Sequence, residues 1–327
     1  KTEDMMGPGI ELPAALGTNV PPTNNTDMKT YGWELQIGWR DQIGDFKYGA
    51  KLSLSDSQSK ILRYGNPTGS LSKYVEGELI GNIYGYTTIG IAKTDEEMQQ
   101  HLASLPNGGQ SALGSQWAAG DIMYADLNGD GKINNGSYTI NDMGDMKKIG
   151  NSTPRFMTGI NLDAAYKGWD LQMFWQGVLK RDWWPGDKNM TFWGVTDGEW
   201  WSTSFKEHLD YFRTSENPLG ENLNSYYPRP IFNTKNNKSQ TRYLQNAAYM
   251  RLKNIQVGYT FPKVWINKLM LQNLRIFVSG ENLLTITSLS DTMDPETCGA
   301  GYQSTEQANG TVYPLAKTIS FGLSVNF

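Results

Sequence analysis

The stretch ISFGLSVNF at positions 319–327 decides the fold of this chain. Every second position in it is apolar: Ile319, Phe321, Leu323, Val325 and Phe327. Period-2 alternation of this kind predicts a β-strand with one apolar and one polar face. A strand that alternates up to a terminal aromatic residue is typical of the closing strand of a membrane β-barrel.

The same alternation recurs upstream. In GWELQIGWR at 32–40, the apolar face carries Trp33, Leu35, Ile37 and Trp39. Comparable segments, joined in pairs by short turns such as RDQIGD and YKGWD, lie at 46–54, 156–166, 171–175, 254–261 and 274–286. Together they predict about seven strands of roughly 9 to 11 residues, the length that a tilted strand needs to cross a bilayer.

Long polar segments alternate with the short turns and occupy about 63–152, 185–247 and 288–315. Brief turns at one end and long extracellular loops at the other are typical of membrane barrels, whereas soluble sandwiches usually have short loops at both ends. We therefore expect an all-β fold, a transmembrane antiparallel β-barrel, to which the whole of 1–327 contributes. Because large plugged transporters use about 22 strands, we expect the signal peptide, the plug and the N-terminal strands to belong to a longer protein.

Composition excludes several function classes. A hydrophobic content of 38% and a mean hydropathy of -0.52 resemble a soluble protein, but membrane strands carry a polar lumen face that lowers both values. A net charge of -4 argues against a nucleic-acid partner. The single cysteine, Cys298, excludes an internal disulfide; a buried or bystander thiol is expected, and pairing with another chain is the alternative.

One loop segment has the spacing of a calcium site. DLNGDGKIN at 126–134 fits the first nine positions of a calcium-binding loop. Asp126, Asn128 and Asp130 would supply side-chain oxygens, Gly131 the sharp turn, and Lys132 its backbone carbonyl. Calcium is favoured over magnesium, because Mg²⁺ prefers to keep its waters.

The bidentate glutamate expected at the twelfth position of such a loop is replaced by Ser137. After an insertion, Asp142 or Asp145 could supply the missing carboxylate. The alternative is a solvated turn that binds nothing.

An aromatic cluster marks the second long segment: Trp183, Trp184, Phe192, Trp193, Trp200, Trp201, Phe205, Tyr211 and Phe212. Flat rings beside polar groups suit sugar faces, and Trp193, Trp200 and Trp201 are the candidate substrate contacts. Membrane-girdle positions for the first two tryptophans, and loop packing or a protein contact for the others, are the alternatives. A short helix is expected at 200–212.

No catalytic arrangement emerges. His101 and His208 lie in unrelated polar contexts, where solvated surface positions are expected, and no nucleophile motif accompanies them. The sequence predicts a protein that is not an enzyme.

Several segments, in order, resemble the SusC/RagA-type TonB-dependent outer-membrane transporters of the Bacteroidota. They include KTYGWELQIGWRDQIGDF, GDIMYADLNGDGKIN, DMKKIGNSTPRFMTGINLDAAYKGWDLQMFWQG, YLQNAAYMRLKNIQVGYTFP and YPLAKTISFGLSVNF. The resemblance spans nearly the whole chain and implies a multi-pass protein in the outer membrane of a Gram-negative bacterium. The family's spacing also favours Asp145 as the missing calcium ligand.

The resemblance implies import of oligosaccharides together with a SusD-like surface lipoprotein, in a dimer of such pairs, with surrounding outer-membrane lipid. The TonB–ExbB–ExbD system would drive import through N-terminal parts that these residues do not include. Three alternatives remain: a RagA-like peptide importer, a passive porin or adhesin barrel, and a secreted calcium-dependent carbohydrate-binding β-domain.

Overall fold

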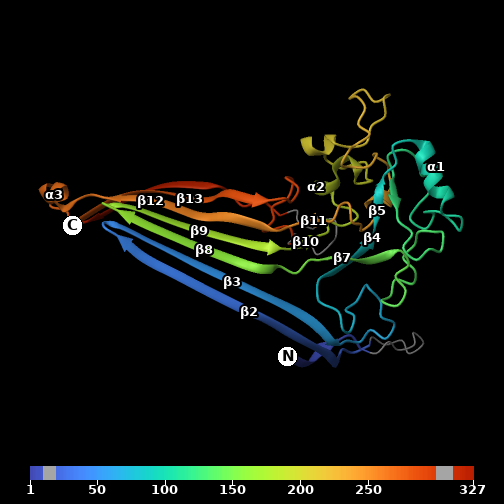
Figure 1. Ribbon diagram of the computed structural model, residues 1–327, viewed down its shortest axis with the longest axis horizontal. Helices are drawn as coiled ribbons and strands as arrows, with labels where there is room; N and C mark the ends of the chain where they lie inside the picture. The colour runs from blue at the N-terminus through green and yellow to red at the C-terminus, as the bar shows by residue number, and fades with distance from the viewer. Residues whose placement is uncertain (10–19, 300–311) are drawn as a thin grey trace.

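A computed structural model describes residues 1–9, 20–299 and 312–327. It consists of a long curved sheet and a cap of loops at one end of that sheet (Figure 1). The sheet has eight antiparallel strands in the order β1-β2-β3-β8-β9-β12-β13-β14. Their bounds are β1 Thr2–Gly7, β2 Thr23–Ile43, β3 Phe46–Arg63, β8 Arg155–Tyr166, β9 Trp169–Lys180, β12 Tyr249–Thr260, β13 Asn273–Thr287 and β14 Thr318–Asn326.

The predicted strands are present, but the structure adds one short strand and makes two others longer than predicted. β1 is a short strand that the alternation did not predict; it pairs with the start of β2. β2 has 21 residues and β3 has 18, well beyond the predicted length. The two keep pairing past the apolar band, as far as Asp27 opposite Arg63, because polar residues satisfy the ladder as well as apolar ones do.

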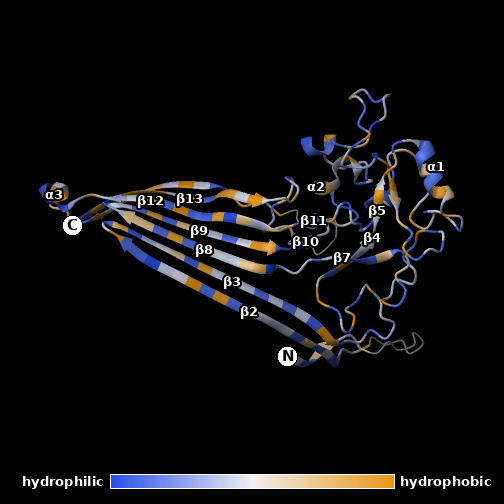
Figure 2. Ribbon diagram, viewed as in Figure 1, coloured by the Kyte–Doolittle hydropathy of each residue, from blue (hydrophilic) through white to orange (hydrophobic). Residues whose placement is uncertain are grey.

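The register gathers the apolar side chains on one face of the sheet. One row runs across the strands through Ala164, Leu171, Val257, Val278 and Phe321. Hydrophobic and hydrophilic positions accordingly alternate along each long strand in Figure 2. The apolar face is uncovered, with Phe321 82% exposed, so it requires an apolar environment outside the chain.

The opposite face is polar and carries two ion bridges of the same design. Arg40 on β2 reaches across Gly49 on β3 to Asp163 on β8, with Nη2 to Oδ1 at 3.1 Å. A Cβ at Gly49 would lie 2.6 Å from Asp163 Oδ1. The missing side chain therefore lets the arginine span three strands.

The second bridge joins Arg275 on β13 to Asp170 on β9, with Nε to Oδ1 at 3.0 Å. The strand between them carries Gly258, where a Cβ would lie 2.3 Å from Arg275 Nη2. Each glycine is thus required by the guanidinium that crosses it.

Short connections join the strands at the end of the sheet where β2 meets β3 and β8 meets β9 (Figure 1). The third connection at this end holds the helical turns α3 Lys263–Ile266 and η5 Asn267–Leu269. Among the described residues, no helix combines the length and the apolar character needed to cross a membrane.

The long segments contain the remaining elements. In the first are β4 Asn82–Tyr86, β5 Thr88–Ile91, α1 Asp95–Ala103, β6 Ile122–Tyr124 and β7 Met146–Asn151. In the second are β10 Asp182–Trp183, α2 Met190–Trp193, η2 Gly194–Thr196, η3 Lys206–Leu209, η4 Lys235–Asn237 and β11 Gln245–Asn246. The helix expected at 200–212 is reduced to the single turn η3.

These segments form a cap with a hydrophobic core of its own. The buried cluster draws on all three long segments, for example through Tyr124, Trp193 and Met293. Trp193 lies edge-on to Tyr243, with ring centroids 4.8 Å apart. The cap is therefore a packed body rather than a set of independent loops.

A buried ion network fastens the first long segment to the second. Asp121 is fully buried and accepts hydrogen bonds from Arg229 (2.7 Å) and Asn236 (2.9 Å), and its Oδ2 lies 2.8 Å from Lys235 Nζ. Burial alone would raise the pKa of Asp121, but the bonds from these three side chains outweigh it and hold the pKa below its usual value.

The third long segment is tied to the sheet at β12. Arg251, on β12, donates to Asp294 (2.8 Å) and to Glu296 (2.8 Å). Cys298 follows in the same segment and is buried, as expected. Part of the expected loop 288–315, residues 300–311, lies outside the described residues.

Candidate functional site

The acidic loop 126–134 is wound by hydrogen bonds from its own backbone. Asp126 accepts from the N–H groups of Gly129 (2.7 Å) and Gly131 (2.9 Å). Asn128 accepts from Asp130 N–H at 3.0 Å. Both glycines have φ near +77°, a conformation that other residues adopt at a cost. The D-x-N-x-D-G spacing thus produces a tight turn with several side-chain oxygens on its inner side.

Asp145 closes this loop from a distance in the sequence. It is fully buried, and its two oxygens accept from Leu127 N–H (2.9 Å) and Asn134 N–H (2.8 Å), one at each end of the loop. Asp142, the other candidate, accepts instead from Ser137 N–H at 2.8 Å. The fold therefore brings Asp145, rather than Asp142, to the predicted ligands.

The two carboxylates of this loop differ in their electrostatics. Burial raises the pKa of Asp145, and the neighbouring charge of Asp126 adds to the effect. For Asp126, burial acts in the same direction, but hydrogen bonds from Gly131 and Gly129 outweigh it and lower the pKa.

The donor set is that of a hard cation, because every predicted ligand is an oxygen. Within 1–9, 20–299 and 312–327, no group of three or more His, Cys, Asp or Glu side chains is arranged to hold a metal. A calcium ion would therefore need amide and carbonyl oxygens, such as those of Asn128 and Lys132, besides the carboxylates. Lys132 Nζ also lies 3.9 Å from Asp130 Oδ2. The calcium site stays a prediction.

The three candidate tryptophans lie in different environments. Trp200 is 79% exposed and Trp201 55%, and their rings pack edge to face with centroids 5.2 Å apart. Trp193 is fully buried and its indole N–H donates to the Gly186 carbonyl at 2.8 Å. Only the first two present ring surface to solvent, whereas Trp193 supports the cap core.

His208 is not at the surface, where the sequence had placed it. Its Nδ1 accepts from Phe205 N–H at 2.8 Å and its Nε2 lies 3.1 Å from the Phe192 carbonyl. This pattern defines a neutral ring that donates from Nε2. Burial lowers the pKa of His208 and maintains that state.

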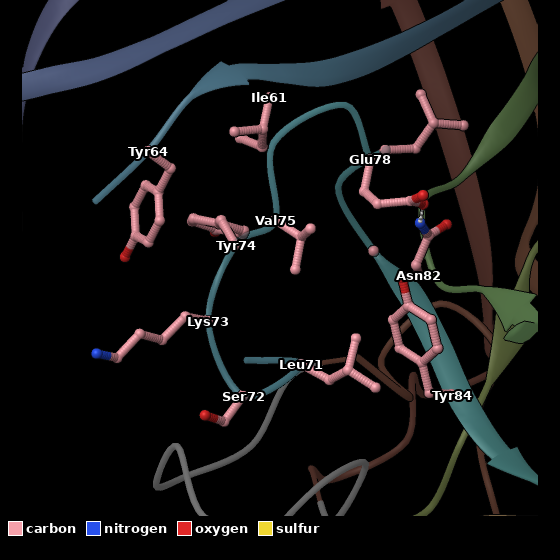
Figure 3. Close-up of a pocket in the computed structure, with 12 residues that line it drawn as sticks. Ile61, Tyr64, Leu71, Ser72, Lys73, Tyr74, Val75, Glu78, Asn82 and Tyr84 are labelled. Carbon is pink, nitrogen blue, oxygen red and sulfur yellow. Dashed lines mark hydrogen bonds between the residues drawn. The ribbon is translucent and has the colours of Figure 1, made fainter. Parts of the chain in front are cut away.

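A hollow of about 320 Å³ lies beside the C-terminal end of β3 (Figure 3). Tyr64 and Tyr74 form one wall, edge to face at 5.3 Å. Asn82 donates to Glu78 at 2.7 Å on the opposite side, where the ring of Tyr84 also stands. The lining combines ring faces with hydrogen-bonding groups, which suits a small hydroxyl-bearing ligand. Sequence patterns do not reveal this hollow, because most of its wall comes from a long segment without periodicity.

Comparison with known proteins supports the fold and extends over the whole chain. No family model matches it. TonB-dependent receptors P3 and P39 of Formosa agariphila are 28% and 23% identical to it, over 349 and 362 residues. Both alignments cover 100% of this chain, but 31% and 33% of those proteins. Over its whole length, the chain is therefore similar to about a third of a TonB-dependent receptor.

Solved structures show the same fold. The RagAB peptide transporter superposes with a TM-score of 0.65 at 19% identity, over 99% of this chain and 32% of that one. The RagAB peptide importer in its "open-open" state gives 0.62 at 19% identity, over 99% and 31%. The chain thus spans about a third of the length of the proteins it matches.

The predicted fold class is confirmed: the chain forms a large antiparallel sheet that matches the barrel wall of outer-membrane transporters. The predicted location, the outer membrane of a Gram-negative bacterium, is confirmed, and the strands of the chain cross that membrane several times. The uncovered apolar face is consequently the surface that meets lipid, and the polar face lines the lumen.

Proposed function

We propose that this chain forms part of the wall and the extracellular cap of a TonB-dependent importer of oligosaccharides. The observation that carries the proposal is the cap itself. Three long segments pack into one body at one end of the sheet, and that body carries solvent-facing aromatic rings and polar hollows. Such surfaces suit the capture of a hydroxyl-rich ligand. The relatives are receptors rather than enzymes, and no covalent chemistry is proposed.

A SusD-like surface lipoprotein is the proposed partner. The loop 195–232 exposes several large apolar side chains, including Trp200, Phe205, Leu209 and Phe232. Exposed apolar groups of this kind favour a protein contact, and the fold is shared with the RagAB peptide transporter. We further propose that TonB–ExbB–ExbD supplies energy through other parts of the protein and that two transporter–lipoprotein pairs associate.

A peptide importer is the second candidate, because the structurally similar RagAB complexes are described as peptide importers. The secreted β-domain is inconsistent with the outer-membrane location. The passive porin is disfavoured by the relationship to TonB-dependent receptors.

Uptake by cells tests the proposal. Cells with the full-length gene and cells with a deletion would be given fluorescent oligosaccharides or peptides, with and without a protonophore. We expect energy-dependent accumulation of oligosaccharides only when the gene is present. Accumulation of peptides alone would replace the proposal by its second candidate, and uptake that ignores the protonophore would contradict both.

We also propose a structural Ca²⁺ bound by Asp126, Asn128, Asp130, Lys132 and Asp145. Support comes from the fold, which brings the distant Asp145 into contact with the loop that holds the other four. The ion would link the two ends of this loop and stiffen the first long segment.

A further inference from the structure

A second, larger hollow of about 600 Å³ lies where all three long segments of the cap meet. Its walls come from β4, from the residues before and after β7, from β10, and from Ser239 and Gly299. The hollow thus exists only when the cap is assembled. Its lining includes none of residues 126–134 and neither Trp200 nor Trp201.

The charged residues of the lining are Arg181, Lys238 and Asp187, which leaves a surplus of one positive charge among them. Lys238 and Asp187 neutralise each other, with Nζ to Oδ2 at 3.2 Å. Arg181 also lines the wall, and within the described parts of the chain it forms no ion pair; its Nε donates to the Ser152 carbonyl at 3.3 Å. Its Nη2 lies 2.1 Å from where a Cβ of Gly299 would stand, so the glycine leaves the room that the guanidinium occupies.

The remaining lining is aromatic and polar. Trp183 is 3% exposed, and its indole nitrogen has no hydrogen-bond partner in the described structure. A buried donor without an acceptor is unusual and calls for an acceptor from outside the protein. Ring faces and amides, such as those of Tyr86, Tyr138 and Asn135, complete the wall.

We propose that this hollow binds a saccharide bearing an anionic group, a carboxylate or a sulfate, which pairs with Arg181. Guanidinium groups bind such planar or tetrahedral anions through charge-assisted hydrogen bonds. The ring faces would pack on the sugar, and Trp183 would donate to one of its oxygens. Ile83 and Met146 are the aliphatic residues of the lining, too few to form a pocket for apolar peptide side chains. The inference rests on the proposed import of oligosaccharides.

Binding to the purified full-length transporter tests it. The probes are a uronate-bearing oligosaccharide, a sulfated one, a neutral one of equal length and an acidic peptide, measured by titration calorimetry at low and high salt. We expect the wild type to prefer one of the two anionic saccharides, and added salt to reduce that preference. The two anionic probes distinguish carboxylate from sulfate as the recognised group.

Variants locate the site. Arg181→Gln is expected to weaken binding of the anionic saccharide by about tenfold or more and to leave the neutral one unchanged. Arg181→Lys should restore part of the affinity, because it keeps the charge without the planar fork. Arg213→Gln is the matched control. Arg213 is in the second long segment, lies outside this hollow, and donates to the Gly220 carbonyl.

Trp183→Phe separates binding from folding. It removes the indole N–H that lacks a partner while keeping an aromatic ring, so we expect weaker saccharide binding without a lower melting temperature. A lower melting temperature with unchanged affinity would assign Trp183 a purely structural role and overturn its part in the site.

The outcomes separate this inference from the proposed function. Equal affinity for neutral and anionic saccharides, or an Arg181→Gln variant that binds like the wild type, would overturn the anionic site and leave oligosaccharide import standing. Binding of the peptide with no saccharide bound would overturn both.

Discussion

At the scale of single residues, the acidic loop depends on Asp145, whose buried carboxylate joins the first and last turns of 126–134. The missing twelfth ligand left Asp142 and Asp145 as candidates, and the spacing that the family resemblance implies favoured Asp145. Two adjacent carboxylates, Asp126 and Asp145, repel each other when both are ionised, and a bound cation would remove that repulsion. The local geometry therefore agrees with the proposed ion.

Removal of a proposed ligand tests the ion. In the full-length protein, Asp130→Ala should reduce calcium content and weaken calcium affinity by about tenfold, because one charged oxygen is lost. Protease cleavage within 63–152 should become faster. Elemental analysis and limited proteolysis measure the two effects, with Asp142→Ala as the control that keeps both at wild-type values. Unchanged metal content together with unchanged cleavage would remove the calcium site from consideration.

His208 is a residue whose environment the sequence did not reveal, because its burial depends on the assembled cap. Its pKa is lowered by burial, so the folded state disfavours the protonated ring. The neutral His208 therefore stabilises the fold at neutral pH. This stabilisation is lost as pH falls below the pKa of the histidine in the unfolded chain, about 6.5.

We accordingly expect the segment around η3 to be cleaved faster at about pH 5.5 than at about pH 7.5. In His208→Gln, which cannot titrate, this difference should shrink even if cleavage is faster at both values. Limited proteolysis with an enzyme active over the whole range provides the measurement. The same pH difference in the variant and the wild type would show that other groups cause it.

At the scale of elements, the strands were the predictable part of the fold, because their period-2 pattern is imposed by the two environments on the faces of the sheet. The ends of β2 and β3 were not predictable, since the polar residues beyond the apolar band do not alternate with apolar ones. The ion bridges across Gly49 and Gly258 also escaped prediction, because each joins strands that are distant in sequence.

Leu52 and Ser53 are neighbours on β3 that face opposite sides of the sheet, so one substitution can be compared on both. Leu52→Arg puts a charge on the lipid face and should cost about 2–4 kcal/mol near the bilayer midplane. Ser53→Arg puts the same group in the lumen and should cost far less. The yield of heat-modifiable, folded protein in outer-membrane fractions measures assembly. Equal loss for both variants would contradict the assignment of the faces.

At the scale of the whole molecule, the cap is the feature that sequence reasoning missed. Its segments were expected to be long polar loops, yet they bury a continuous core that includes Trp193, Tyr243 and Met98. No periodicity marks these residues, because their partners lie far along the chain: Tyr243 is 50 positions from Trp193, and Arg229 is 108 positions from Asp121. The candidate tryptophans could be found in the sequence, but which of them face solvent is decided by this long-range packing.

The buried network around Asp121 makes the cohesion of the cap testable. Asp121→Asn leaves Lys235 and Arg229 without their counter-charge, and loss of one partner from a buried pair costs about 3–5 kcal/mol. Because the network joins two long segments, both should become more accessible together, although the substitution lies in only one. Hydrogen exchange of the full-length protein would show faster exchange in 110–124 and in 229–240. Asp210→Asn makes the same change at an exposed aspartate of the second long segment, and its exchange should match the wild type. Faster exchange confined to the segment that carries Asp121 would mean that the two segments fold independently and that the cap is not one body.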